Sequence, residues 1–178
     1  KQSLKENISR DILIIQSIHS IDELISIINK MFALLKERYG YYAPKISRSD
    51  DIGLILDNVF KKTREEMSID LNNYDLDSII ELASEIQNLI KLKNSQEKYL
   101  ESLMSRLCPN LFKSAGSLIG ARLVDHAGSL KHLAELPSST IKILGAEKAL
   151  FRHLKSGAKA PKFGVIFANP SISKESVN

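Results

Sequence analysis

Apolar residues recur every three or four positions from residue 4 to residue 39, and no proline or glycine interrupts them. That spacing puts them on one face of a helix, so the pattern predicts a long helix over this stretch. A shorter helix is expected at about residues 51–62, and a second long helix, capped by Asp75 or Asp77, is expected to reach Leu107. Two long helices with a short connector can fold back as an antiparallel coiled-coil arm, or they can belong to an ordinary bundle.

Glycines and prolines divide the remaining chain into shorter pieces. Ser129 is expected to cap one short helix, and Ser138 or Ser139 is expected to cap the next. Gly116 and Gly120 lie four residues apart, which would allow another helix to approach closely. The expected segments are helices over residues 111–126, 129–135, 138–144 and 146–156, and an extended segment over 163–167. The fold class is therefore all-α, with a coiled-coil arm over residues 1–108, a compact helical domain over 109–172 and a tail over 173–178.

Composition excludes several classes of protein. The chain has 178 residues, of which 43% are apolar, so it can bury a sizeable core. A single cysteine, Cys108, excludes an internal disulfide framework and a multi-cysteine zinc site. No apolar run is long enough to span a membrane, and we expect a soluble intracellular protein. No histidine has metal-ligand spacing and no catalytic motif is evident, so we expect no metal, cofactor or catalytic residue.

Basic residues concentrate in the last third of the chain. Residues 1–110 hold 15 Lys and Arg against 17 Asp and Glu, whereas residues 111–178 hold 10 against 4. The excess is densest from Lys142 to Lys162, where six basic residues face one acid, Glu147. A local excess of this kind is typical of a phosphate-binding surface, although a solvated basic face gives the same pattern.

The expected helix over residues 146–156 separates charged from apolar side chains. Lys148, Arg152 and Lys155 share one face because they lie at positions i, i+4 and i+7. The start of this helix follows Gly145 and is expected to offer backbone N–H groups to a phosphate. Two lysines continue the basic line beyond the helix: Lys159 and Lys162.

The other face of the same helix is apolar. It carries three large side chains, Leu150, Phe151 and Leu154. Such a stripe usually faces a core, so we expect Phe151 to pack inside the domain rather than to stack on a base.

Several sequence blocks follow one another in a recognisable order. They are Gly120-Ala121-Arg122-Leu123, Ala127-Gly128-Ser129-Leu130, Leu136-Pro137-Ser138-Ser139-Thr140-Ile141, Leu144-Gly145-Ala146-Glu147-Lys148-Ala149-Leu150-Phe151-Arg152 and Pro161-Lys162-Phe163-Gly164-Val165-Ile166-Phe167. Together they closely resemble the Nop domain in its archaeal form, the core scaffold of box C/D guide-RNA ribonucleoproteins. The first half resembles the coiled-coil region of that family, so the resemblance covers nearly all of residues 20–172.

The resemblance implies a scaffold rather than an enzyme. In that family the coiled coil forms a homodimer, and the Nop domain binds a kink-turn RNA jointly with a small kink-turn-binding protein. A separate N-terminal domain recruits fibrillarin, the methyltransferase for 2′-O-methylation. The implied partners are thus a box C/D guide RNA, a kink-turn-binding protein and a second copy of the chain. The implied location is the cytoplasm of an archaeal cell, or the nucleolus of a eukaryotic one.

The same resemblance assigns residues to two surfaces. RNA contacts are implied for the longest matching block: Gly145, Lys148, Ala149, Leu150, Phe151 and Arg152. Helix geometry and charge extend that set to three further lysines: Lys155, Lys159 and Lys162. The face for the protein partner is expected on the glycine-bearing helix, at Leu118, Arg122 and Asp125.

The chain also departs from the family pattern. It begins inside the first long helix and ends at Asn178, so we interpret it as a fragment that lacks the fibrillarin-recruiting domain. Relatives often have a polar side chain just after the Phe167 position, where this chain has Ala168. Two alternatives remain open at this point: a scaffold like the splicing relative of the family, or a plain coiled-coil association protein without RNA.

Overall fold

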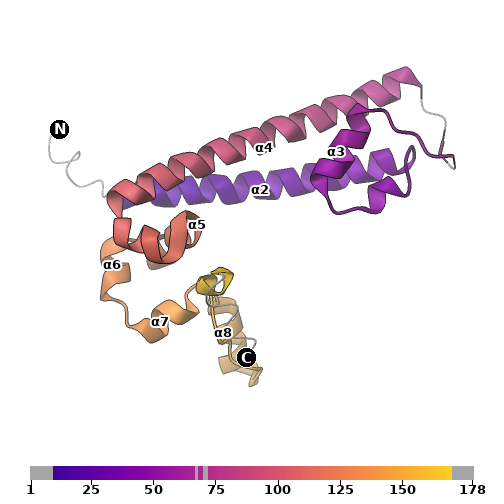
Figure 1. The fold of residues 1–178 in the computed structure, drawn as a ribbon. Helices are drawn as coiled ribbons and strands as arrows, with labels where there is room; N and C mark the ends of the chain where they lie inside the picture. Colours follow the sequence, from indigo (N-terminus) through magenta and orange to yellow (C-terminus); the bar gives the residue numbers. More distant parts are fainter. Residues whose placement is uncertain (1–9, 67, 70–71, 170–178) are drawn as a thin grey trace, which may run out of the picture. The chain divides into compact units, whose positions relative to one another are not determined.

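The computed structural model describes residues 10–66, 68–69 and 72–169, and every regular element in these ranges is a helix. The all-α prediction is therefore confirmed. The described chain forms two units, one of residues 10–20 with 96–169 and one of residues 21–95. Its two long helices, α2 (Asp11–Gly40) and α4 (Asn73–Leu107), each contribute to both units (Figure 1).

The unit of residues 21–95 packs three helices around one core. Within it, α2 and α4 lie side by side, and the short α3 (Ile52–Phe60) packs with them (Figure 1). All three helices, together with the turn after α2, contribute to the core, whose most deeply buried members are Leu35, Tyr39, Ala43, Ile55, Val59, Ala83 and Ile86. The spacing of three and four along α2 is thus the spacing of its buried residues, as predicted.

Helix starts in this unit depend on side-chain oxygens. Asp51 caps α3, since its Oδ1 accepts a hydrogen bond of 3.2 Å from the N–H of Leu54. The start of α4 was predicted one turn too late. It begins at Asn73, and Asn72 Oδ1 accepts the N–H of Asp75 at 2.8 Å. Asp75 therefore lies inside the first turn, where it donates to the cap instead of being one.

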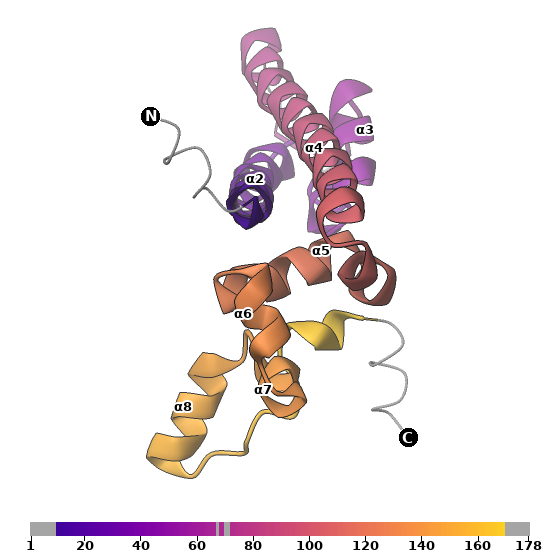
Figure 2. The same ribbon diagram turned by 90° about the vertical axis from the view of Figure 1, so that its left-hand side faces the viewer.

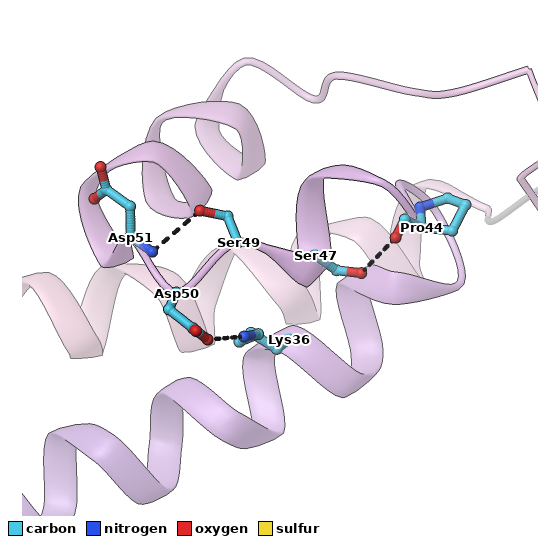
Figure 3. Close-up of polar contacts among 6 residues, drawn as sticks. All are labelled: Lys36, Pro44, Ser47, Ser49, Asp50 and Asp51. Atoms are coloured by element: carbon cyan, nitrogen blue, oxygen red, sulfur yellow. Dashed lines mark hydrogen bonds and ion pairs between the residues drawn. The ribbon is translucent and has the colours of Figure 1, made fainter.

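The connector between α2 and α3 is fixed by polar contacts (Figure 3). It contains the short 3₁₀ helix η1 (Ile46–Arg48). Lys36 of α2 pairs with Asp50 through an Nζ–Oδ1 distance of 2.7 Å, and Ser47 Oγ donates to the carbonyl of Pro44 at 3.2 Å. Asp50 thereby has a lowered pKa, because the hydrogen bond and the charge of Lys36 favour the carboxylate.

The other unit joins both long helices to a series of shorter ones. These are α5 (Pro109–Ala127), α6 (Leu130–Glu135), α7 (Ser138–Ile143) and α8 (Glu147–Ser156), followed by the 3₁₀ helix η2 (Val165–Ala168), as Figure 2 shows. Its most deeply buried side chains come from α2, α4 and α5: Ile14, Ile18, Leu100, Leu103, Met104, Ala121, Leu123 and Val124. Two carboxylates reinforce this packing. Asp11 Oδ2 accepts the N–H of Leu130, and Asp125 Oδ1 pairs with His19 Nε2 at 2.7 Å.

The two glycines of α5 have different roles. Gly120 is buried, and a Cβ there would lie 2.7 Å from Met104 Cε, so the predicted close approach holds at this position. Gly116 has φ 77° and ψ 179°, and a Cβ there would touch nothing within 4 Å. The prediction of close packing at Gly116 is therefore wrong. This residue makes a kink in α5, because only glycine adopts that backbone conformation readily.

Of three expectations near the end of the chain, one is confirmed and two are corrected. Ser129 caps α6 as predicted, with its side chain accepting the N–H of His132. In contrast, α7 follows Pro137 and has no side-chain cap, so neither Ser138 nor Ser139 has that role. The segment expected to be extended contains η2 instead, and backbone bonds from Phe167 to Gly164 and from Asn169 to Ile166 close its turns.

No helix in the described part of the chain is both long and apolar enough to cross a membrane.

Candidate nucleic-acid interface

Helix α8 is framed by two glycines in the left-handed conformation. Gly145 (φ 84°) turns the chain between α7 and α8, and Gly157 (φ 68°) ends α8. After Gly157, the Nδ1 atom of His153 contacts the carbonyl of Ala158, which ties residue 158 to the last turn of α8. The predicted helix over residues 146–156 is thus present, with Ala146 at its N-cap.

The turn at Gly145 is joined to the segment that follows α8. Gly164 donates its N–H to the carbonyl of Lys142 at 2.8 Å, and Val165 donates to the carbonyl of Leu144 at 2.7 Å. These bonds bring the backbones so close that a Cβ on Gly164 would overlap the Leu144 carbonyl. A Cβ on Gly145 would likewise overlap the side chain of Val165. Both positions require glycine for space, and Gly145 also requires it for its positive φ.

The carboxylate of Glu147 binds one of the backbone N–H groups that were expected to be available to a phosphate. Glu147 Oε1 accepts the N–H of Gly145 at 2.6 Å and lies 3.7 Å from Nδ1 of His126. Burial raises the pKa of Glu147, but the backbone N–H bonds and His126 outweigh it, so the pKa is lowered. The N–H of Gly145 is therefore not free for a phosphate.

The basic face of α8 is fully presented to solvent. Lys148, Arg152 and Lys155 are exposed, and their spacing places them along one side of the helix. The next two lysines, Lys159 and Lys162, are exposed as well. Within the described residues, none of these five side chains forms an ion pair or a hydrogen bond. All five cations are therefore exposed, and no described residue neutralises their charges.

The apolar face of α8 is not covered by the domain. Phe151 is 70% exposed and Leu154 is 71% exposed, while Leu150 is half-buried. The expectation that these side chains face a core is therefore wrong for Phe151 and Leu154. Among the described residues, α8 buries none of its own, and Ala149 is exposed too. A stripe of apolar residues shows only which helix face is apolar; here most of the side chains of Phe151 and Leu154 remain uncovered by other elements.

The predicted face for a protein partner lies on α5, after its kink. Leu118, Arg122 and Asp125 are all half-buried, and their spacing of four and three places them on one side of the helix. Asp125 has an internal role, because it holds His19 of α2. What remains exposed of this face is a mixture of apolar and charged atoms.

Sequence reasoning missed an aromatic cluster beside the basic line. The rings of Phe163 and Phe167 stack with centroids 5.9 Å apart, and Lys142 Nζ lies 4.9 Å from the Phe163 centroid. Together with Lys162 and Gly164, the two rings line a hollow of about 440 Å³. The detectable signal was two phenylalanines four residues apart in a segment rich in lysine and glycine. That spacing brings rings together only in a helical turn, whereas an extended segment was expected.

The described residues hold no group of three or more His, Cys, Asp or Glu that could bind a metal ion.

Comparison with known proteins places these features in a family. Residues 48–178 match the model of the Nop family, described as snoRNA binding domain, fibrillarin. An uncharacterised NOP5 family protein of Methanocaldococcus jannaschii is 34% identical over 92% of this chain and 46% of its own length. Nucleolar protein 56 of Homo sapiens is 35% identical over 98% of this chain and 35% of its own. The chain thus spans less than half the length of these relatives.

The family model describes an RNA-binding domain and not a catalytic one, in agreement with the resemblance found in the sequence. The match covers α3 to η2, so it includes α8 with its line of cations and the turn at Gly145. The chain belongs to the Nop family.

Proposed function

We propose that this chain is the central part of a box C/D ribonucleoprotein scaffold that binds a kink-turn guide RNA through α8. The observation that carries the proposal is the line of solvent-facing cations on α8, none of which is paired within the described residues. Phosphate oxygens are suitable counter-charges for such a line, and arginine in particular can form two parallel hydrogen bonds to one phosphate. The proposed RNA contacts are Lys148, Ala149, Leu150, Phe151, Arg152, Lys155, Lys159 and Lys162. Gly145, whose N–H is held by Glu147, is proposed to shape the turn at the start of α8 rather than to bind a phosphate through that N–H.

The apolar face of α8 fits the same proposal. A purely phosphate-binding helix would need only its charges, yet Phe151 and Leu154 present their side chains to solvent at about 70% exposure. An aromatic ring can stack on a base at the end of an RNA duplex, which a buried ring cannot do. The proposed surface therefore meets RNA through both its charges and its apolar side chains.

The proposed surface is shared with a second protein. We assign the kink-turn-binding protein to the face of α5 that carries Leu118, Arg122 and Asp125, and we expect RNA binding to be weak without it. Catalysis of 2′-O-methylation would belong to fibrillarin and not to this chain. The proposed setting is the cytoplasm of an archaeal cell.

Self-association is proposed for the arm, residues 1–108, and RNA and partner binding for residues 109–172. In the unit of residues 21–95, α2 and α4 leave several large apolar side chains exposed, including Ile27 (41%), Leu34 (54%) and Leu92 (46%). Because these side chains are already about half covered, burying the remainder against a second copy would contribute about 1 kcal/mol for each one. Leu34→Lys combined with Leu92→Lys should therefore shift the chain towards a monomer in sedimentation equilibrium.

A gel-shift titration tests the RNA proposal directly. The probe is a box C/D kink-turn RNA, titrated with the chain in the presence and absence of a kink-turn-binding protein at several salt concentrations. We expect a supershift that requires the partner. If four cations contact phosphates, the slope of log affinity against log salt should be about −3 to −4. No shift under either condition would leave the arm's association as the function of this chain.

Two double variants locate the contact surface. Lys148→Ala with Arg152→Ala should weaken the supershift and make the salt slope shallower by about 2. Lys113→Ala with Lys131→Ala is the matched control, because it removes two exposed cations of the same unit from α5 and α6. An equal loss in both variants would mean that general charge, and not α8, attracts the RNA.

A further inference from the structure

A hollow lined mainly by charged side chains lies in the unit of residues 21–95, where the turn after α2 meets the segment after α3. It has a volume of about 630 Å³ and is lined by Pro44, Lys45, Arg48, Arg64, Glu65 and Glu66. We call it the tip pocket. Its volume lies in the range of about 300–1,000 Å³ that is typical of sites for small ligands.

The walls of the tip pocket are held in place by the fold itself. The carboxylate of Glu65 accepts the backbone N–H of Lys45 at 3.0 Å and that of Ile46 at 2.9 Å. Glu65 also donates its own N–H to the carbonyl of Tyr42 at 3.4 Å. On the other wall, Ser47 holds the carbonyl of Pro44, as Figure 3 shows. A ligand would therefore meet a preformed rim and would not have to order it.

The charges at this end of the unit are distributed unevenly. Outside the tip pocket, each of three lysines has a carboxylate partner: Lys36 with Asp50 at 2.7 Å, Lys61 with Asp57 at 2.9 Å and Lys62 with Asp77 at 3.6 Å. Inside it, the side chains of Lys45 and Arg48 form no ion pair or hydrogen bond with any described residue. Both are exposed, and both line the hollow. The fold neutralises its other lysines here and leaves these two cations to the pocket.

The two carboxylates of the tip pocket differ in whether their oxygens already accept backbone hydrogen bonds. Both oxygens of Glu65 face the backbone N–H groups they accept, so this side chain is committed to holding the wall. Glu66 is exposed and lies at the rim. Within the hollow, Arg64 adds a third cationic group, whose Nε donates to Ser68 Oγ at 2.9 Å. Three cations thus face two carboxylates in the tip pocket, and the oxygens of one of these carboxylates are held by the backbone.

We propose that the tip pocket binds a phosphate group, held by Lys45 and Arg48. Phosphate matches the donors present, because a guanidinium offers paired N–H groups and an ammonium offers a point charge. The phosphate can belong to an RNA backbone or to a free polyphosphate, and both sources present the same oxygens. This site is built from residues 44–66 and does not depend on RNA binding by α8.

The test uses inorganic tripolyphosphate as the first probe, titrated into the whole chain by calorimetry. We expect saturable binding that weakens at least tenfold in Lys45→Gln with Arg48→Gln. Glu66→Gln should tighten it, because the substitution removes a like charge from the rim. The matched control is Lys61→Gln with Lys62→Gln, which changes the net charge of the same tip by the same amount outside the pocket and should leave the affinity unchanged.

The second probe distinguishes the two sources of phosphate. If the pocket takes an RNA backbone, Lys45→Gln with Arg48→Gln should also reduce the salt slope of kink-turn RNA binding by about 2. If only tripolyphosphate binding responds, the ligand is a free polyphosphate. The proposal is overturned if neither probe responds to this variant, or if the Lys61 and Lys62 control weakens binding equally. If only Lys148→Ala with Arg152→Ala reduces RNA binding, that result supports the proposed function of α8 and says nothing about the tip pocket.

Discussion

Replacing Gly164 with alanine should separate the segment after α8 from the turn at Gly145. The Cβ of alanine would overlap the carbonyl of Leu144 and lie 2.6 Å from its carbon atom, well inside ordinary contact. Both partners are backbone, so no side chain can turn away to make room. The segment must move, and the bonds from Gly164 to Lys142 and from Val165 to Leu144 are lost with it.

The expected cost follows from these two bonds. Each backbone hydrogen bond contributes about 0.5–1.5 kcal/mol net, so the pair contributes about 1–3 kcal/mol. Alanine returns about 0.4–1 kcal/mol, because it has less conformational freedom than glycine in the unfolded chain. The net free energy for opening this segment should therefore fall by about 1–2 kcal/mol. That corresponds to roughly 5- to 30-fold faster exchange of the protected amide hydrogens.

Hydrogen exchange measured by NMR is the assay, with the amide of Val165 as the main reporter. Gly157→Ala is the control, because Gly157 has φ 68° and open space around its Cβ. It should strain the end of α8 by about 1 kcal/mol without touching the Val165 bond. The reasoning is refuted if Val165 exchanges as slowly in Gly164→Ala as in the parent chain, or if the Gly157 control accelerates it equally.

Three further predictions concern the buried core. Gly120→Ala should lower the free energy of unfolding in urea by about 1 kcal/mol or less, because the Met104 Cε that its Cβ would meet at 2.7 Å ends a flexible side chain and alanine favours a helix interior by about 0.5–1 kcal/mol. In a Met104→Ala background, which itself costs about 2–5 kcal/mol, the same substitution should cost less than in the parent chain. Burial is the main cause that raises the pKa of Tyr39 to about 12, so stability should be lost as the pH rises from about 10 through 12. Tyr39→Phe should flatten that loss, and the tyrosinate absorbance step near pH 12 should disappear with it. Burial also raises the pKa of the Cys108 thiol, so a thiol reagent should modify it only after urea unfolds the chain; rapid modification of the native chain would contradict the buried geometry.

The long helices could be predicted from sequence because their signal is repeated many times. Nine apolar positions at spacings of three and four lie within α2, and one mistaken residue among them would not change the period. Their starts depend on single residues, and there the prediction failed. Asp75 and Asn72 are both suitable caps, and the choice between them depends on which one lies in the loop when α4 packs.

Single residues also account for the other differences between the sequence-based predictions and the structure. Gly116 and Gly120 look equivalent in the sequence, yet one kinks α5 and the other makes room for Met104. The 3₁₀ turn of η2 depends on long-range bonds from Gly164 and Val165 to the end of α7, which no local pattern contains. The aromatic pair of Phe163 and Phe167 was missed for the same reason, because the pair forms only once that turn exists.

The exposed apolar face of α8 has the clearest consequence for function. A stripe of this kind normally gains its stability by facing a core, and a fully covered phenylalanine or leucine contributes about 1.5–3 kcal/mol. In this chain Phe151 and Leu154 gain little of that, since both remain about 70% exposed. The opposite face of α8 carries cations that the fold does not neutralise. A helix with both faces largely uncovered contributes little to its own domain, so its residue pattern is better explained by what it contacts outside the chain. Phe151→Ala should therefore leave the free energy of unfolding nearly unchanged while weakening the RNA supershift, and a large loss of stability would contradict this reasoning.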